Sequence, residues 1–132
     1  MLVTPSSENL HALLVLDLRL VNWKDDHLSL NQRDHPHERA RKTKLWRTLG
    51  FKAARQASVR PLEGARIEVW YRYPDNRRRE VSNLQNLSKA LVDGIVDAGV
   101  LPDDSDLHVI GPDNRRDPVN GSHQVVVRIL AL

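Results

Sequence analysis

The sequence contains no cysteine, and this absence removes several classes of protein at once. Disulfide frameworks, cysteine zinc sites, thiol redox chemistry and cysteine nucleophiles all need a residue that the chain does not have. Long hydrophobic runs are also missing, since the longest one near the N-terminus, residues 12–16, is far below the ~20 residues that span a membrane. No basic segment followed by an apolar one marks a secretory signal. We therefore expect a cytoplasmic protein with no membrane partner.

Composition is that of a folded globular domain. Hydrophobic residues make up 40% of the 132 residues and charged residues 28%. A chain of this length is enough for one domain and short for two. We expect residues 1–10, with Pro5, Ser6 and Ser7, to form a flexible leader and residues 11–132 to form a single domain.

Hydrophobic periodicity predicts the order of the elements. Apolar or alternating segments predict four strands, over residues 11–20, 66–73, 107–110 and 123–130. Two helices are predicted between them, over residues 38–57 and 82–98. The resulting order, β-α-β-α-β-β, predicts a single α+β domain with a mixed four-stranded sheet and two main helices.

The two predicted helices differ in character. The first follows Pro36, which suits a first helical turn, and it is basic and amphipathic, with Trp46 expected in the core. The second begins with Ser82-Asn83-Leu84-Gln85, the form of a capping box that places Ser82 at the N-cap. Its apolar residues form one stripe, at Leu84, Leu87, Leu91 and Ile95. Gly99 is expected to end it.

Charge is distributed unevenly, although the net value is only +3. Residues 33–60 carry nine basic and two acidic residues, whereas residues 82–106 carry five aspartates and one lysine, Lys89. A basic block beside an acidic block is what a polyanion held near a cation site needs. The charge pattern alone favours the plainer interpretation of two solvated faces of opposite sign.

Carboxylates occur on both sides of the second predicted helix. Glu80 precedes it, and three aspartates follow it, at Asp103, Asp104 and Asp106. Mg²⁺ is usually held by one or two carboxylates with water and substrate phosphate, and it can activate water for attack on a phosphodiester. A helix of about 16 residues is ~24 Å long, so sequence spacing alone does not bring these carboxylates together. By themselves, the aspartates fit a solvated turn and Lys89 fits a solvated helix face.

Two groups of motifs point to a family. The first group is Arg77-Arg78-Arg79-Glu80-Val81-Ser82-Asn83-Leu84, Lys89, Asp93-Gly94 and Asp97-Ala98-Gly99-Val100-Leu101-Pro102-Asp103-Asp104. The second group is Leu28-Ser29-Leu30-Asn31-Gln32-Arg33-Asp34-His35, followed by Lys44, Trp46 and Arg47. In this combination the chain resembles the RusA family of Holliday-junction resolvases and its phage and prophage relatives, over roughly residues 12–130.

The resemblance implies a homodimeric, Mg²⁺-dependent endonuclease of recombination and repair that cuts branched DNA, with Mn²⁺ as a substitute ion. It implies metal ligands at Glu80, Asp103 and Asp104, and catalytic residues at Glu80, Asp104 and Lys89. In some relatives the lysine falls at the position of Asn86. The family pairing also implies that the dimer or the sheet returns the later aspartate toward the start of the helix.

One departure from the family pattern bears on catalysis. Family members carry Asp-x-Asp-Asn before the helix, whereas this chain has Glu80 at the first aspartate and Ser82 at the second. Serine keeps a cap worth roughly 1 kcal/mol but removes a candidate ligand. The alternative is therefore a catalytically weak or inactive RusA-like DNA-binding homologue. A third interpretation is an unrelated small interaction domain with a basic face.

The expected DNA-binding surface is basic. Its residues are Arg39, Arg41, Lys42, Lys44, Arg47, Arg77, Arg78 and Arg79. His35 and His37 lie beside Asp34 with a spacing that could suit a transition metal. We expect these histidines to face solvent or DNA phosphate instead, because no third ligand accompanies them.

Overall fold

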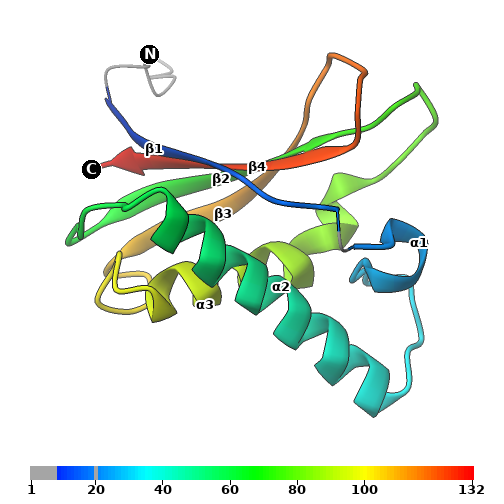
Figure 1. Cartoon of the computed structure of the whole chain (residues 1–132), viewed down its shortest axis with the longest axis horizontal. Helices are drawn as coiled ribbons and strands as arrows, with labels where there is room; N and C mark the ends of the chain where they lie inside the picture. Colours follow the sequence, from blue (N-terminus) through cyan, green and yellow to red (C-terminus); the bar gives the residue numbers. More distant parts are fainter. Residues whose placement is uncertain (1–8, 20) are drawn as a thin grey trace.

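A mixed sheet with two helices packed on one of its faces forms the framework of the chain (Figure 1). The computed structural model describes residues 9–19 and 21–132. The elements are β1 (Leu10–Val15), α1 (Trp23–Asp26), α2 (Pro36–Gln56), β2 (Ala65–Arg72), the 3₁₀ helix η2 (Val81–Leu84), α3 (Gln85–Asp97), β3 (Val109–Arg116) and β4 (Gln124–Ala131). This confirms the α+β class, with a four-stranded sheet and two main helices, and adds the short helix α1.

The sheet has the strand order β1-β4-β2-β3. β4 pairs antiparallel with both β1 and β2, whereas β2 and β3 run parallel because α3 connects them as a crossover. Alternate residues of β2 and β4 are fully buried, which is the period-two pattern of strands with one covered face. The helices therefore cover this face of the sheet.

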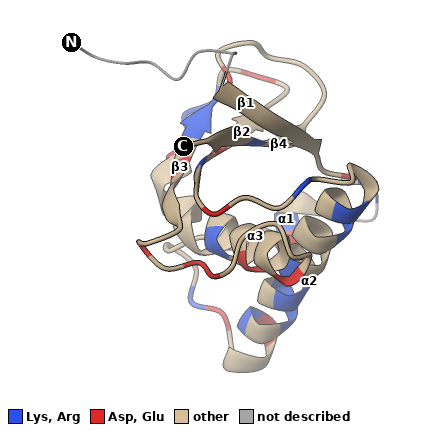
Figure 2. Cartoon of the chain, turned by 90° about the vertical axis from the view of Figure 1, so that its left-hand side faces the viewer, with Lys and Arg blue, Asp and Glu red and all other residues tan. Residues whose placement is uncertain are grey.

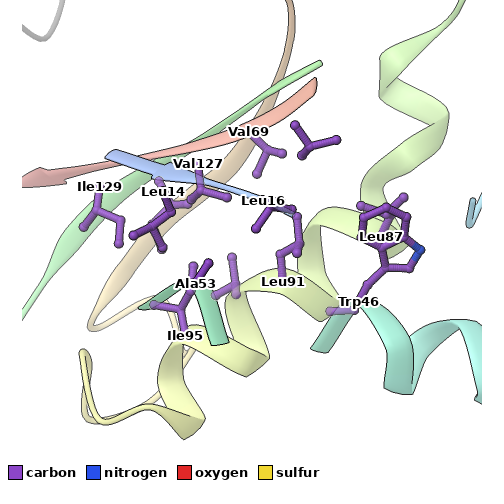
Figure 3. Packing of buried hydrophobic residues seen from close by; sticks show 14 of the residues in the cluster. Leu14, Leu16, Trp46, Ala53, Val69, Leu87, Leu91, Ile95, Val127 and Ile129 are labelled. Atoms are coloured by element: carbon purple, nitrogen blue, oxygen red, sulfur yellow. The ribbon is translucent and has the colours of Figure 1, made fainter. Parts of the chain in front are cut away.

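The core lies between the sheet and the two long helices (Figure 3). The sheet side contributes Leu14, Leu16, Val69, Val127 and Ile129, and the helices contribute Trp46, Ala53, Leu87, Leu91 and Ile95. Fully burying a leucine, isoleucine or valine stabilises the fold by about 1.5–3 kcal/mol relative to exposure. The apolar stripe predicted for the second helix is confirmed, and Trp46 is fully buried as expected.

The two long helices, α2 and α3, cross with their backbones in contact at two glycines. At Gly94 of α3, an added Cβ would collide with the backbone oxygen of Arg47, and at Gly50 of α2 it would collide with the backbone of Leu91. Since backbone cannot move aside as a flexible side chain can, both positions require hydrogen in place of a side chain. This close crossing fixes the position of the polar face of α3 relative to α2.

The predicted start of the second helix is wrong in detail. The chain forms the 3₁₀ helix η2 first, with Glu80 at its N-cap and no hydrogen bond from the Glu80 side chain to the cap. α3 then begins at Gln85, and its N-cap is Leu84, so Ser82 caps neither segment. The capping-box prediction failed because the pattern does not distinguish a 3₁₀ turn from the first turn of an α-helix. The predicted end is confirmed, since Gly99 follows the C-cap with a φ of 85°.

Strand boundaries also differ from the predictions. β1 ends at Val15 instead of residue 20, and it begins at Leu10, inside the expected leader; residues 1–8 of that leader lie outside the described residues. β3 continues to Arg116 through a segment that its glycine, proline and aspartate predicted to be a loop. It does so because Gly111 adopts a φ of 106° and the β2–β3 register shifts there, which accommodates the irregular residues within the strand.

Among the described residues, no helix has the length and apolar character needed to cross a membrane.

We expect Gly94→Ala to lower the free energy of unfolding by about 1–3 kcal/mol, although alanine favours an isolated helix over glycine by about 1 kcal/mol. The added methyl group must push α2 and α3 apart at their crossing. Urea unfolding measures the change, and Thr48→Ala, at an exposed position of α2, is the control that should leave stability nearly unchanged. A Gly94→Ala protein as stable as the parent would contradict the crossing described here.

Candidate functional site

The polar face of α3 lines a groove. Asn86, Lys89 and Asp93 follow helical spacing on the side opposite the buried leucines, and all three line a cavity of about 490 Å³. The opposite wall comes from the loop between α1 and α2 and from the first turns of α2, with Asp34 and Arg39 among its residues. Side chains of positive and of negative charge therefore line the same cavity.

A second cavity adjoins the first at the start of η2. It measures about 460 Å³, and Ser29 lines both cavities. Its lining includes Arg79, Glu80 and Asn83, around the start of η2, and Trp23 of α1. Lys89 therefore lines the first cavity and Glu80 the second, and the two cavities meet at Ser29.

A buried ion pair holds the outer wall of this groove. The Lys42 side chain is only 3% exposed, and its ammonium donates to Asp34 at 2.9 Å and to the Gln32 carbonyl at 3.4 Å. Gln32 in turn hydrogen-bonds the His27 ring at 3.1 Å. A buried charge must be paired in this way, because an unpaired one is strongly destabilising. Lys42, which we expected on the DNA-binding surface, instead fastens the loop to α2.

Two carboxyl groups meet near the end of α3. Burial raises the pKa of Asp93, and the adjacent Asp104 carboxyl raises it further, while the hydrogen bond from Asp93 lowers the pKa of Asp104. Two carboxyl groups in contact resist being ionised together unless a cation neutralises them. The positive charges of Lys89 and Arg47 oppose the rise at Asp93. Asp93 was not among the expected ligands, although it belongs to the Asp-Gly motif.

The predicted metal ligands lie apart within one chain. Glu80 precedes η2 and pairs with Arg78 at 3.1 Å, whereas Asp103 and Asp104 lie in the loop after α3 (Figure 1). The 13-residue helix between them is about 20 Å long. Among the described residues, no group of three or more histidine, aspartate or glutamate side chains could hold a metal ion. Ser82 is exposed and offers no carboxylate beside Glu80.

The sheet does not close this distance. β3 runs antiparallel to α3 and returns the chain to η2, where the Asn114 side chain donates to the Val81 carbonyl at 2.9 Å, but the Asp103-Asp104 loop itself stays at the other end of α3. Within one chain the sheet therefore brings Asp113 and Asn114 to the start of α3, and it does not bring Asp103 or Asp104 there.

Lysine and arginine recur along α2 (Figure 2). Most of the predicted DNA-binding arginines pair with nearby carboxylates, namely Arg41, Arg47, Arg77, Arg78 and Arg79. Arg39 and Lys44 are exposed and form no ion pair with a described residue. Exposed ion pairs contribute only about 0–1 kcal/mol, so the exposed Arg77 and Arg78 can exchange a carboxylate for a phosphate at little cost. Arg79 is less available, because its side chain is 25% exposed and lies over the Tyr73 ring.

His35 and His37 form a local cap. The His35 ring accepts a hydrogen bond from the His37 backbone N–H at 3.3 Å, and the two exposed rings stack with centroids 5.1 Å apart. His35 is the N-cap of α2, and Pro36 and His37 are the first two residues of the helix.

An aromatic cluster beside Glu80 was missed by the sequence analysis. Trp23 stacks on His27 at 5.3 Å and meets Tyr73 and His123 edge-on at 6.2 and 4.5 Å. These rings come from separate segments of the chain, so no local sequence motif predicts that they cluster. The nearest signal was the Trp23–His27 spacing of one helical turn.

Comparison with known proteins found that no protein-family description matches the chain and that no curated protein matches it significantly. The functional conclusion therefore rests on the residues of this chain and their geometry.

We expect His123 to make stability dependent on pH. Burial lowers its pKa from the usual 6.5, so below pH 6.5 the unfolded chain takes up a proton that the folded chain resists. The thermal midpoint should fall as the pH drops from 7.5 toward 5.5. His123→Phe keeps an aromatic ring against Trp23 and Tyr73 and should flatten this dependence, whereas His37→Gln, at an exposed ring, should preserve it. Equal pH profiles for the parent and His123→Phe would disprove the assignment.

Proposed function

We propose that the protein is a Mg²⁺-dependent endonuclease that acts on branched DNA as a homodimer, in the manner of the RusA resolvases. One observation carries the proposal: Lys89 and Asp93 line a cavity that adjoins the cavity of Glu80, and Asp104 contacts Asp93. Acidic groups, a central lysine and flanking arginines are the parts that phosphodiester hydrolysis requires.

The chemistry of the donors suits a hard divalent cation. Asp93 and Asp104 present adjacent carboxylates, and a cation between them relieves the repulsion that raises the pKa of Asp93. When bound, Mg²⁺ supplies an activated water and neutralises charge at the scissile phosphate. Lys89 contacts that phosphate from the middle of the groove, and the surrounding arginines hold the neighbouring phosphates.

Completion of the ligand set needs two chains. Glu80 and Asp104 lie toward opposite ends of one helical face, so two copies packed antiparallel along this face would put Glu80 of one chain against the other chain's Asp104. A two-fold axis generates two such sites per dimer. Two cuts placed symmetrically are what resolution of a four-way junction demands.

A second candidate is a DNA-binding homologue that does not cut. Ser82 offers no charge at the position of the second family aspartate, and Glu80 is already paired with Arg78. Such a protein would retain the arginines and the groove but lack a complete ligand set.

Cleavage of synthetic four-way junctions separates the two candidates. We expect the parent to cut them with Mg²⁺ or Mn²⁺, Glu80→Ala to lose at least a hundredfold in rate, and Ser82→Asp to cut faster than the parent because it restores a carboxylate. Gel assays with labelled arms measure the products. Binding by the parent without cutting, with cutting only by Ser82→Asp, would establish the second candidate. Absence of salt-sensitive junction binding would contradict both.

Subunit mixing tests whether the site spans two chains. Glu80→Ala and Asp104→Ala homodimers should each be inactive, whereas an equal mixture should recover about a quarter of the parental rate, because half of the dimers are mixed and each holds one complete site. The mixture is denatured and refolded together, and a Glu80→Ala sample treated alone is the control. A mixture as inactive as its components would show that all ligands come from one chain.

A further inference from the structure

The cavity beside Glu80 has aromatic walls as well as polar ones. Trp23, His27 and Tyr73 line it together with Asn31 and Asn83. Its volume of about 460 Å³ lies within the range of about 300–1,000 Å³ that is usual for small-molecule sites. Catalysis as proposed above uses only Glu80 at its rim, so these aromatic and amide groups have no role in holding a metal ion.

The aromatic wall is rigid. Trp23 is held between His27, stacked at 5.3 Å, and His123, edge-on at 4.5 Å, and it also packs edge-on against buried Trp46 at 6.0 Å. The His27 ring is fixed in turn by a hydrogen bond to the Trp23 carbonyl at 2.7 Å. The Tyr73 ring is already covered by the stacked His123 ring at 5.4 Å and by the Arg79 guanidinium at 4.3 Å, so stacking of a flat ligand must use the Trp23–His27 pair. Rings that are already fixed lose little entropy when a flat ligand stacks against them.

Several polar groups around this cavity have no partner. The side-chain amides of Asn31 and Asn83 and the hydroxyl of Tyr73 form no hydrogen bond with any residue in the described part of the chain. Asn31 is exposed and Asn83 is half-buried, and the Tyr73 hydroxyl is not among the buried side-chain atoms of the described residues that lack a partner, so all three groups are open to a ligand. An amide supplies donors and an acceptor together, and such a pair matches the edge of a heteroaromatic ring.

We infer that this cavity binds an unstacked nucleobase of the branched DNA. The inference rests on the proposed function and names the part of the substrate that the cavity takes. Unstacked bases occur where helices exchange strands, and proteins commonly bind them by stacking on aromatic rings and by hydrogen bonds to the base edge. Arg78, whose side chain is 91% exposed at the rim, is placed to hold the adjoining phosphate.

Charge favours a base over an apolar peptide side chain. The cavity is lined by Arg78, Arg79 and Glu80 and by the amides of Asn31 and Asn83, which an apolar side chain would shield from water without pairing. A base satisfies these groups and brings its own phosphate to the arginines. Glu80 then lies next to the backbone of the extruded nucleotide, where the proposed cut is made.

A cycle that pairs abasic junctions with cavity variants tests the inference. Four-way junctions that each lack one base near the crossover are titrated in EDTA with the parent, with Tyr73→Phe/Asn83→Ala and with Asn31→Ala, and binding is followed by fluorescence anisotropy. We expect the parent to lose roughly tenfold in affinity at one abasic position, as stacking of a single base predicts. Each cavity variant should bind the intact junction several-fold more weakly and lose little further affinity at that position.

The controls separate the possible outcomes. Gln56→Ala, an exposed amide at the end of α2, should behave as the parent does. Asn31→Ala changes only an exposed loop residue, so it reports on the cavity even if the double variant is destabilised. Equal affinity for all abasic junctions, or a tenfold loss that persists in the cavity variants, would overturn the base site while leaving junction cleavage intact. Failure of the parent to bind any junction would overturn both.

Discussion

The glycine-mediated crossing of α2 and α3 is the constraint on which the rest of the structure depends. Because Gly50 and Gly94 let the two backbones touch, one helix can bury its leucine stripe against the sheet while its other side stays beside the basic helix. A wider crossing would open the core and move Lys89 away from the loop that faces it. The same contact thus serves packing and the shape of the groove.

Two buried polar contacts hold the outer wall of the groove in place. The pair of Lys42 with Asp34 ties the loop to α2, and the Trp46 indole donates to the Asp26 carbonyl at 2.8 Å, which ties α1 to the same helix. Both contacts use buried polar groups that cost free energy when they lack a partner. They therefore favour the one position of the wall in which each group is paired. The aromatic cluster around Trp23 is fixed as a consequence.

Sequence patterns predicted the elements better than the site. Period-two burial in β2 and the stripe at Leu87 and Leu91 follow from local spacing, so the class and the core could be foreseen. The 3₁₀ start of α3 and the length of β3 could not, because each depends on tertiary contacts of residues that also suit loops. Lys42 was expected on the DNA-binding surface for the same reason, because nothing in the local sequence of a basic helix indicates which lysine has a buried partner.

The position of the carboxylates relates catalysis to assembly under the proposed function. Asp93 and Asp104 already share a site in which full ionisation is unfavourable, and Glu80 is neutralised by Arg78 about one helix length away. One chain therefore holds each acidic group in a stable state without a metal ion. In the proposed dimer, a second chain packed along α3 would bring its Glu80 to the paired aspartates, and a cation would then neutralise all three carboxylates. A nuclease built in this way would be inert as a single chain and would acquire its cation only as a dimer.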